Sequence, residues 1–144
     1  MKLTLHIGAG KTGTSSVQRF LQNNQTLLRE NRIFYTKYLD NIDHGEIKLI
    51  NFQFFDNPEQ TLGSLRNYAI NNGMERVIWS LESLFTLDQK SIELITKVFA
   101  EDDIEIIAFI KRQDLWYQSA FYQWGCRHKT YQGKYLIDFN EFYQ

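Results

Sequence analysis

The spacing of hydrophobic residues changes from a period of two to a helical period within the first thirty residues. Lys2–Ile7 alternates between apolar and polar positions, which predicts a first strand. The glycine-rich segment Gly8–Gly13 follows as a loop. A helix is then expected, capped by Thr14 or Ser15 and running to about residue 31. Its apolar face would carry Val17, Phe20, Leu21 and Leu28.

The same alternation of strands and helices continues along the chain. Pro58 suits a helix start, and a helix over Glu59–Asn71 would end at Asn72-Gly73. Leu87–Phe99 is a further predicted helix, with Asp88 near its cap. Ile104–Ile110, rich in isoleucine, predicts a strand buried on both faces. The remaining expected elements are strands at Ile33–Thr36 and Arg76–Ser80, a helix at Asp114–Trp124 and a helical stretch within Glu46–Phe55.

Strands that alternate with helices predict a parallel sheet covered on both sides. We therefore expect an α/β fold with three α/β/α layers, in which residues 1–144 form a single domain. A length of 144 residues is enough for a sizeable core, and 43% apolar with 23% charged residues is a globular composition.

The net charge and the cysteine content indicate which binding partners and which cellular compartment to expect. A net charge of −1 gives no reason to expect a nucleic-acid or membrane-surface partner, so recognition of an anion must be local. The single cysteine, Cys126, excludes an intramolecular disulfide and favours a reducing compartment. No segment predicts a signal peptide or a membrane span, so a cytoplasmic protein is expected. Cys126 lies far from any spacing typical of metal ligands, so no metal site is predicted.

Large aromatic side chains crowd towards the C-terminus, from Trp116 to Tyr143. They could stack on a sugar acceptor, but packing in the core or against another subunit is the favoured interpretation. A homo-oligomer formed through this region is therefore an expectation. His6, within the first strand, is expected to be structural rather than catalytic.

The loop after the first strand has the form of an anion site, because backbone N–H groups and the helix dipole meet there. Gly8, Gly10 and Gly13 match the dinucleotide pattern G-x-G-x-x-G. The acidic residue that should follow the second strand is missing, because Thr36 is followed by Lys37. An NAD-type oxidoreductase domain therefore stays open as an alternative.

The nucleoside-triphosphate P-loop, G-x-x-x-x-G-K-[ST], fits less well. Gly8 and Gly13 have the right separation and Ser15 falls correctly, but Thr14 stands at the lysine position. A clear Walker B aspartate is also missing, and this interpretation is rejected.

The segment from Lys11 through Thr12, Gly13, Thr14, Ser15 and Ser16 resembles the 5′-phosphosulfate loop of sulfotransferases. That family uses 3′-phosphoadenosine 5′-phosphosulfate (PAPS) to transfer a sulfuryl group to a hydroxyl or an amine. Lysine would supply a mobile charge near the bridging oxygen, while hydroxyls and backbone amides from Gly10 to Ser16 hold the other oxygens.

Two later segments extend this resemblance. Ile106–Tyr122 is similar to the segment that clamps the 3′-phosphate in bacterial carbohydrate sulfotransferases. Lys111 stands eight residues before Ser119 and Arg112 seven, so either base or both could hold that phosphate with the serine. Val77–Phe85 resembles the strand end that presents a carboxylate, which makes Glu82 the candidate base.

The resemblance implies a P-loop-like sulfotransferase fold that transfers sulfate from PAPS to a hydroxyl of a glycan-like acceptor without a metal. Lys11 and Glu82 would be catalytic, and Gly10–Ser16 with Lys111, Arg112 and Ser119 would bind the donor. The family domain is considerably longer, so the resemblance covers nearly all of this chain but only the first part of that domain, which is expected to be truncated here. A catalytically degenerate nucleotide-binding module is the second alternative.

Overall fold

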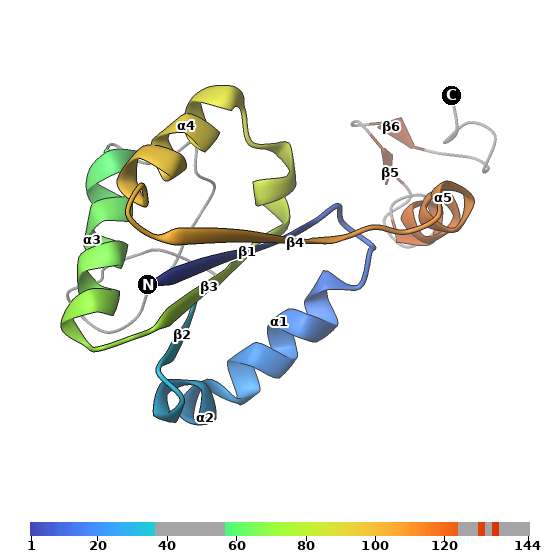
Figure 1. The fold of residues 1–144 in the computed structure, drawn as a ribbon. Helices are drawn as coiled ribbons and strands as arrows, with labels where there is room; N and C mark the ends of the chain where they lie inside the picture. The colour runs from blue at the N-terminus through green and yellow to red at the C-terminus, as the bar shows by residue number, and fades with distance from the viewer. Residues whose placement is uncertain (37–56, 124–129, 132–133, 136–144) are drawn as a thin grey trace.

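The computed structural model describes residues 1–36, 57–123, 130–131 and 134–135. Four parallel strands form its sheet in the order β2-β3-β1-β4 (Figure 1). Their bounds are β1 Lys2–Gly8, β2 Ile33–Thr36, β3 Arg76–Ser80 and β4 Asp103–Phe109. The helices are α1 Thr14–Asn23, α2 Gln25–Glu30, α3 Pro58–Asn71, the short 3-10 helix η3 Glu82–Thr86, α4 Gln89–Val98 and α5 Gln113–Phe121. A separate two-stranded ladder pairs β5 Thr130–Tyr131 with β6 Lys134–Tyr135.

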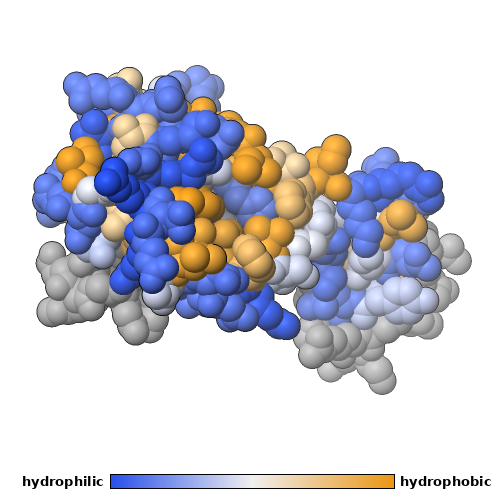
Figure 2. All heavy atoms as spheres, turned by 60° about the horizontal axis from the view of Figure 1, so that its bottom comes forward, coloured by the Kyte–Doolittle hydropathy of each residue, from blue (hydrophilic) through white to orange (hydrophobic). Residues whose placement is uncertain are grey.

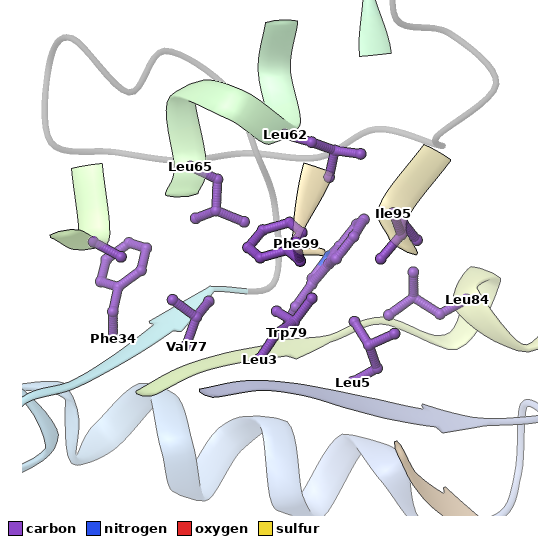
Figure 3. Close-up of a cluster of buried hydrophobic side chains, with 11 residues drawn as sticks. Leu3, Leu5, Phe34, Leu62, Leu65, Val77, Trp79, Leu84, Ile95 and Phe99 are labelled. Carbon is purple, nitrogen blue, oxygen red and sulfur yellow. The ribbon is translucent and has the colours of Figure 1, made fainter. Parts of the chain in front are cut away.

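Helices lie on both faces of the sheet, an arrangement compatible with the predicted three-layer domain. Figure 1 shows α3 and α4 on one face and α1 on the other. Leu3 and Trp79 lie on the face under α3 and α4, where Leu62, Leu65 and Phe99 cover them (Figure 3). All five of these side chains are fully buried. Burying an aliphatic or aromatic side chain of this size stabilises the fold by about 1.5–3 kcal/mol.

The face under α1 is more polar than the first. Thr4, His6 and Ser80 are buried there, and Gln18 of α1 donates its side-chain amide to the Ser80 carbonyl at 3.3 Å. The buried positions of α1 are Thr14, Gln18 and Leu21. Of the predicted apolar face, Leu21 is buried, Val17 and Leu28 are half-buried, and Phe20 is misplaced. Phe20 is 64% exposed. Helix α1 thus packs on its face of the sheet through hydrogen bonds as well as apolar contacts.

The first helix is also shorter than predicted. It ends at Asn23, and α2 begins at Gln25. Asn24 donates both its backbone N–H, at 3.2 Å, and its side-chain amide, at 2.7 Å, to the carbonyl of Phe20. An asparagine side chain that bonds to the preceding turn competes with helix continuation, which accounts for the break. The predicted side-chain cap is absent as well, because Gly13 is the N-cap residue and makes no cap bond.

β4 is the clearest departure from the sequence-based expectation. The strand forms where predicted, but it lies at the edge of the sheet, bonded to β1 on one side. Ile106 is 62% exposed and Ile107 42% exposed, so the strand is not buried on both faces. The apolar composition of this segment correctly predicted a strand. Its burial, however, depends on which strands and helices lie beside it, and this is set by the order of the strands in the sheet.

Several local predictions are confirmed. β2 and β3 have the predicted bounds, and Pro58 opens α3 with Asn57 as its cap. Asp88 caps α4 by accepting a bond from the Ser91 N–H at 2.9 Å. The stretch Glu46–Phe55 and Cys126 lie outside the described residues, as do four of the C-terminal aromatic residues, Trp124, Phe139, Phe142 and Tyr143. None of the helices in the described ranges is long and apolar enough to cross a membrane.

Candidate functional site

The loop between β1 and α1 is a tight turn with two residues at positive φ. Lys11 has a φ of 72° and Gly13 a φ of 100°. Thr12 closes the turn on the carbonyl of Ala9, with its backbone N–H at 3.3 Å and its hydroxyl at 2.7 Å. A lysine at positive φ is uncommon and costs energy, so the turn holds residue 11 in a conformation that the chain would not adopt freely.

Gly8 permits the close approach of this loop to the sheet. A Cβ at position 8 would lie 2.7 Å from Cγ2 of Thr14, 2.9 Å from the Thr12 hydroxyl and 3.1 Å from the carbonyl oxygen of Phe109. Its backbone φ is not positive, so the requirement is one of space rather than of conformation. Gly8 therefore sets the distance between the loop, α1 and the end of β4.

The first turn of α1 presents backbone donors to the carboxyl edge of the sheet. Within the described part of the chain, no acceptor contacts the N–H groups of Gly13, Thr14 or Ser15. Ser15 and Ser16 are exposed, and the Ser16 N–H bonds to the Gly13 carbonyl at 3.2 Å. Unsatisfied N–H groups and the positive end of the helix dipole together favour an anion.

Glu82 lies against this loop, as the sequence predicted. It follows β3, which pairs with β1, so the two strand ends are neighbours. The chain leaves β1 towards the face of α1 and leaves β3 towards the face of α4 (Figure 1), and ligands of open α/β sheets bind at such a divergence. The exposed Glu82 carboxylate accepts a bond from the Thr14 hydroxyl at 2.7 Å. Its other oxygen is 3.6 Å from the position that a Cβ on Gly10 would take.

Lys111 and Ser119 are also brought together. The Lys111 ammonium donates to the Ser119 hydroxyl at 2.5 Å, which in turn donates to the Leu115 carbonyl at 2.9 Å. The spacing of eight residues, from just after β4 into the second turn of α5, therefore brings the two side chains into contact.

Arg112 points to a different partner. Its guanidinium makes two bonds to the Asp114 carboxylate, at 2.7 and 2.8 Å. These bonds raise the pKa of Arg112 and lower the pKa of Asp114. Arg112 is thus not joined to Ser119, and its charge is balanced by a carboxylate.

A pocket of about 180 Å³ connects the loop with the end of β4. Thr12 and Lys111 both line this pocket, together with the aromatic residues Phe109 and Trp116. The other lining residues are Ala9, Phe85, Ile110 and Gln113. The predicted loop and the predicted 3′-phosphate segment therefore border one space at the carboxyl edge of the sheet.

Two contacts from α5 and the residues just after it were not predicted. Trp116 donates its indole N–H to the carbonyl of Gly10 at 2.7 Å, and Lys11 donates its ammonium to the side-chain oxygen of Gln123 at 2.8 Å. Both join residues more than 100 positions apart. No local pattern in the sequence marks such long-range bonds. The Lys11 side chain thus lies towards Gln123.

His6 lies beneath the site, in β1. It is 3% exposed, and its Nδ1 is 2.6 Å from the Ser80 hydroxyl. Its ring meets the Phe109 ring edge to face, with 4.7 Å between ring centroids. Nε2 has no hydrogen-bond partner among the residues described, and burial lowers the pKa of this histidine. This environment fits a neutral structural imidazole.

Comparison with protein-family models, with curated proteins and with solved structures found no match to this chain. In the described ranges, no group of three or more His, Cys, Asp or Glu side chains could hold a metal ion.

Proposed function

We propose that this chain binds PAPS at the carboxyl edge of its sheet and transfers the sulfuryl group to a hydroxyl of a glycan-like acceptor. The fold would be the P-loop-like sulfotransferase fold. The observation that carries the proposal is the bond between Lys111 and Ser119, because Lys111 also borders the pocket lined by Thr12 of the anion loop. A donor with phosphates at both its 5′ and 3′ positions needs two such anion sites within reach of one another.

The strand order counts against the dinucleotide alternative. In the dinucleotide fold the second strand pairs with the first, and its carboxyl end presents the acidic residue to the ribose. Here β3 lies between β1 and β2, so the end of β2 is not adjacent to the glycine loop. The carboxylate that does lie next to the loop is Glu82, and it contacts Thr14 where an anion would sit.

The proposed reaction assigns one role to each charged group. The acceptor oxygen attacks sulfur while the bond from sulfur to the bridging oxygen breaks, and adenosine 3′,5′-diphosphate leaves. Glu82 takes the proton of the attacking hydroxyl. Lys11 neutralises charge on the leaving phosphate, which requires its ammonium to exchange Gln123 for the donor. The degenerate alternative differs in one respect, since it binds the nucleotide without turnover.

Titration calorimetry with adenosine 3′,5′-diphosphate, adenosine 5′-phosphate and NAD tests the binding proposal. We expect the diphosphate to bind best, by about tenfold or more over the monophosphate, because charge-assisted bonds contribute about 1.5–3 kcal/mol. Lys111→Ala should remove this preference, whereas Arg112→Ala should keep most of it. Equal affinity of the wild type for the two adenosine phosphates would contradict a 3′-phosphate site, and stronger binding of NAD would favour the dinucleotide alternative.

Glu82→Gln tests catalysis separately from binding. Removing a negative charge that touches the loop should leave the affinity for adenosine 3′,5′-diphosphate equal or raise it. Transfer of labelled sulfate from PAPS to a glycan mixture should be lost. Glu59→Gln is the matched control, because Glu59 is also an exposed glutamate in the first turn of a helix and lies away from the loop. Nucleotide binding without measurable transfer by the wild type would favour the degenerate module.

A further inference from the structure

Among the residues that the structure describes, the outer edge of β4 is open to pairing with another strand. β4 bonds to β1 through seven residues, Asp103–Phe109, and no other described strand pairs with it. The unpaired backbone groups along such an edge form a template for a further strand. Proteins usually protect a long edge with lysine, proline, a bulge or a covering element. β4 contains neither lysine nor proline.

Apolar side chains are exposed along this strand on both faces of the sheet. Ile104 and Ile106 pair with Leu3 and Leu5 of β1 and are 37% and 62% exposed, while Ile107 is 42% exposed. Ile110, just past the strand, is 84% exposed. Figure 2 shows hydrophobic side chains gathered across the middle of the face that it presents. Exposed apolar patches of this kind are typical of interaction sites.

Of the two acidic residues of β4, Asp103 is its first residue and Glu105, inside the strand, does not guard the edge. Glu105 lies over the sheet towards β1 and β3, where it accepts bonds from Thr4 at 3.1 Å and from Arg76 at 2.8 Å. Lys2 adds an ion pair at 3.5 Å. These contacts lower the pKa of Glu105. Its charge therefore interacts with residues of β1 and β3, which are already part of the sheet, and not with the open edge.

The charges that flank β4 have opposite sign at its two ends. Glu101 and Asp103 stand at its beginning; the Glu101 side chain pairs with Arg66 at 3.1 Å but is 86% exposed, and Asp103 is exposed as well. Lys111 and Arg112 stand just after its end, and both are exposed. Because Asp114 balances the charge of Arg112, Lys111 is the cation that an acidic partner would meet at this end. An antiparallel neighbour with the same sequence would place its acidic beginning beside this basic end and its basic end beside this acidic beginning. A parallel neighbour would place like charges together.

We propose that β4 pairs antiparallel with β4 of a second copy of this chain about a two-fold axis, which joins the two sheets into one. The same patch serves both copies, so the contact closes on itself. The pairing satisfies the open backbone groups, buries the isoleucines and matches the flanking charges twice. This surface differs from the C-terminal aromatic region that the sequence suggested for a homo-oligomer.

Sedimentation over a series of protein concentrations tests the proposal. We expect the mass to rise from 17.2 kDa to twice that value and no further. Ile106→Lys places a charged side chain of the kind that keeps edge strands unpaired into the interface, so the mass should return to that of one chain. Leu27→Lys, at a 56% exposed position of α2, is the matched control and should leave the dimer intact. Glu101→Lys should raise the Kd of the dimer at least tenfold, because the new lysine would lie beside the basic end of β4 of the second copy in the antiparallel arrangement.

Hydrogen exchange localises the contact independently of mass. Amides of β4 that do not bond to β1 should exchange more slowly as the concentration rises, and Ile106→Lys should abolish this dependence. A chain that stays single at all concentrations, an association that continues beyond two copies, or a dimer unaffected by Ile106→Lys would each overturn the proposal. Neither measurement requires nucleotide, so a failure here leaves the proposed PAPS site unaffected.

Discussion

Replacing Gly8 by alanine should displace the anion loop, and the structure gives the size of the effect. The added Cβ would lie 2.7 Å from Cγ2 of Thr14 and 2.9 Å from the hydroxyl oxygen of Thr12. Carbon atoms prefer a separation of about 3.5–4 Å. Both neighbours are short β-branched side chains, and Thr14 is 2% exposed, so neither can rotate away freely.

The third neighbour of position 8 is the backbone carbonyl oxygen of Phe109, at 3.1 Å, which cannot move without shifting the end of β4. Overpacking of this kind costs about 1–3 kcal/mol of stability. For a chain of this size each kcal/mol lowers Tm by about 2–4 °C. Gly8→Ala should therefore lower Tm by about 2–12 °C, and it should weaken the binding of adenosine 3′,5′-diphosphate by moving Thr12 and Thr14.

Gly63→Ala is the control with the same chemical change and the opposite expected sign. Gly63 lies inside α3, and a Cβ there would have no atom within 4 Å. Alanine is favoured over glycine in a helix interior by about 0.5–1 kcal/mol. Scanning calorimetry should thus show a fall in Tm for Gly8→Ala and a small rise for Gly63→Ala. A Gly8→Ala protein that melts at or above the wild-type temperature would refute the close-approach argument.

Three further predictions concern single contacts. Because burial lowers the pKa of His6 below its usual value, the unfolded chain binds the proton more readily; the free energy of unfolding in urea should fall as the pH drops below about 6.5, and a flat profile between about pH 5 and 7 would contradict this. Trp116→Phe keeps the ring but loses the indole donor to the loop, so calorimetry should show binding of adenosine 3′,5′-diphosphate weakened by about tenfold or less; unchanged affinity would mean that this bond does not position the loop. Arg66→Met leaves the carboxylate of Asp102, 3% exposed, without its guanidinium and should cost about 1–3 kcal/mol in urea unfolding, whereas Arg32→Met, in an exposed pair, should cost less than about 1 kcal/mol; equal losses would contradict the role of burial.

The elements predicted correctly from the sequence are those whose signals are local. Pro58 with Asn57 before it and Asn72-Gly73 after it bound α3 through caps that act within one turn. Asp88 does the same for α4. The pairing of Lys111 or Arg112 with Ser119 was implied by the resemblance to the sulfotransferase segment, and the structure brings Lys111 to Ser119 across only eight residues. Glu82 next to the loop follows from the general rule that parallel strands end at one edge.

The features that could not be predicted depend on segments distant in the sequence. Ile104–Ile110 has the composition of a buried strand, but the sheet order leaves β4 at an edge. Phe20 completes an apolar face of α1 in sequence, yet the sheet under that helix is polar and accepts Gln18 instead. Thr14 has the chemistry of a cap, but its hydroxyl bonds to a carboxylate 68 residues away. In each case the partner, rather than the residue itself, decides the outcome.

The partners of the three cations at the site indicate which of them can receive an anion. Lys11 and Lys111 bond to neutral groups, the amide of Gln123 and the hydroxyl of Ser119, so among the described residues neither of these bonds balances the lysine charge with a carboxylate. Arg112 is balanced by a carboxylate that makes two bonds to it. An incoming phosphate would have to displace Asp114 to reach Arg112, whereas the hydroxyl of Ser119 can stay and donate to the same phosphate. The hydrogen-bond partners of the three cations therefore support the proposal that the two lysines, rather than Arg112, receive the anion.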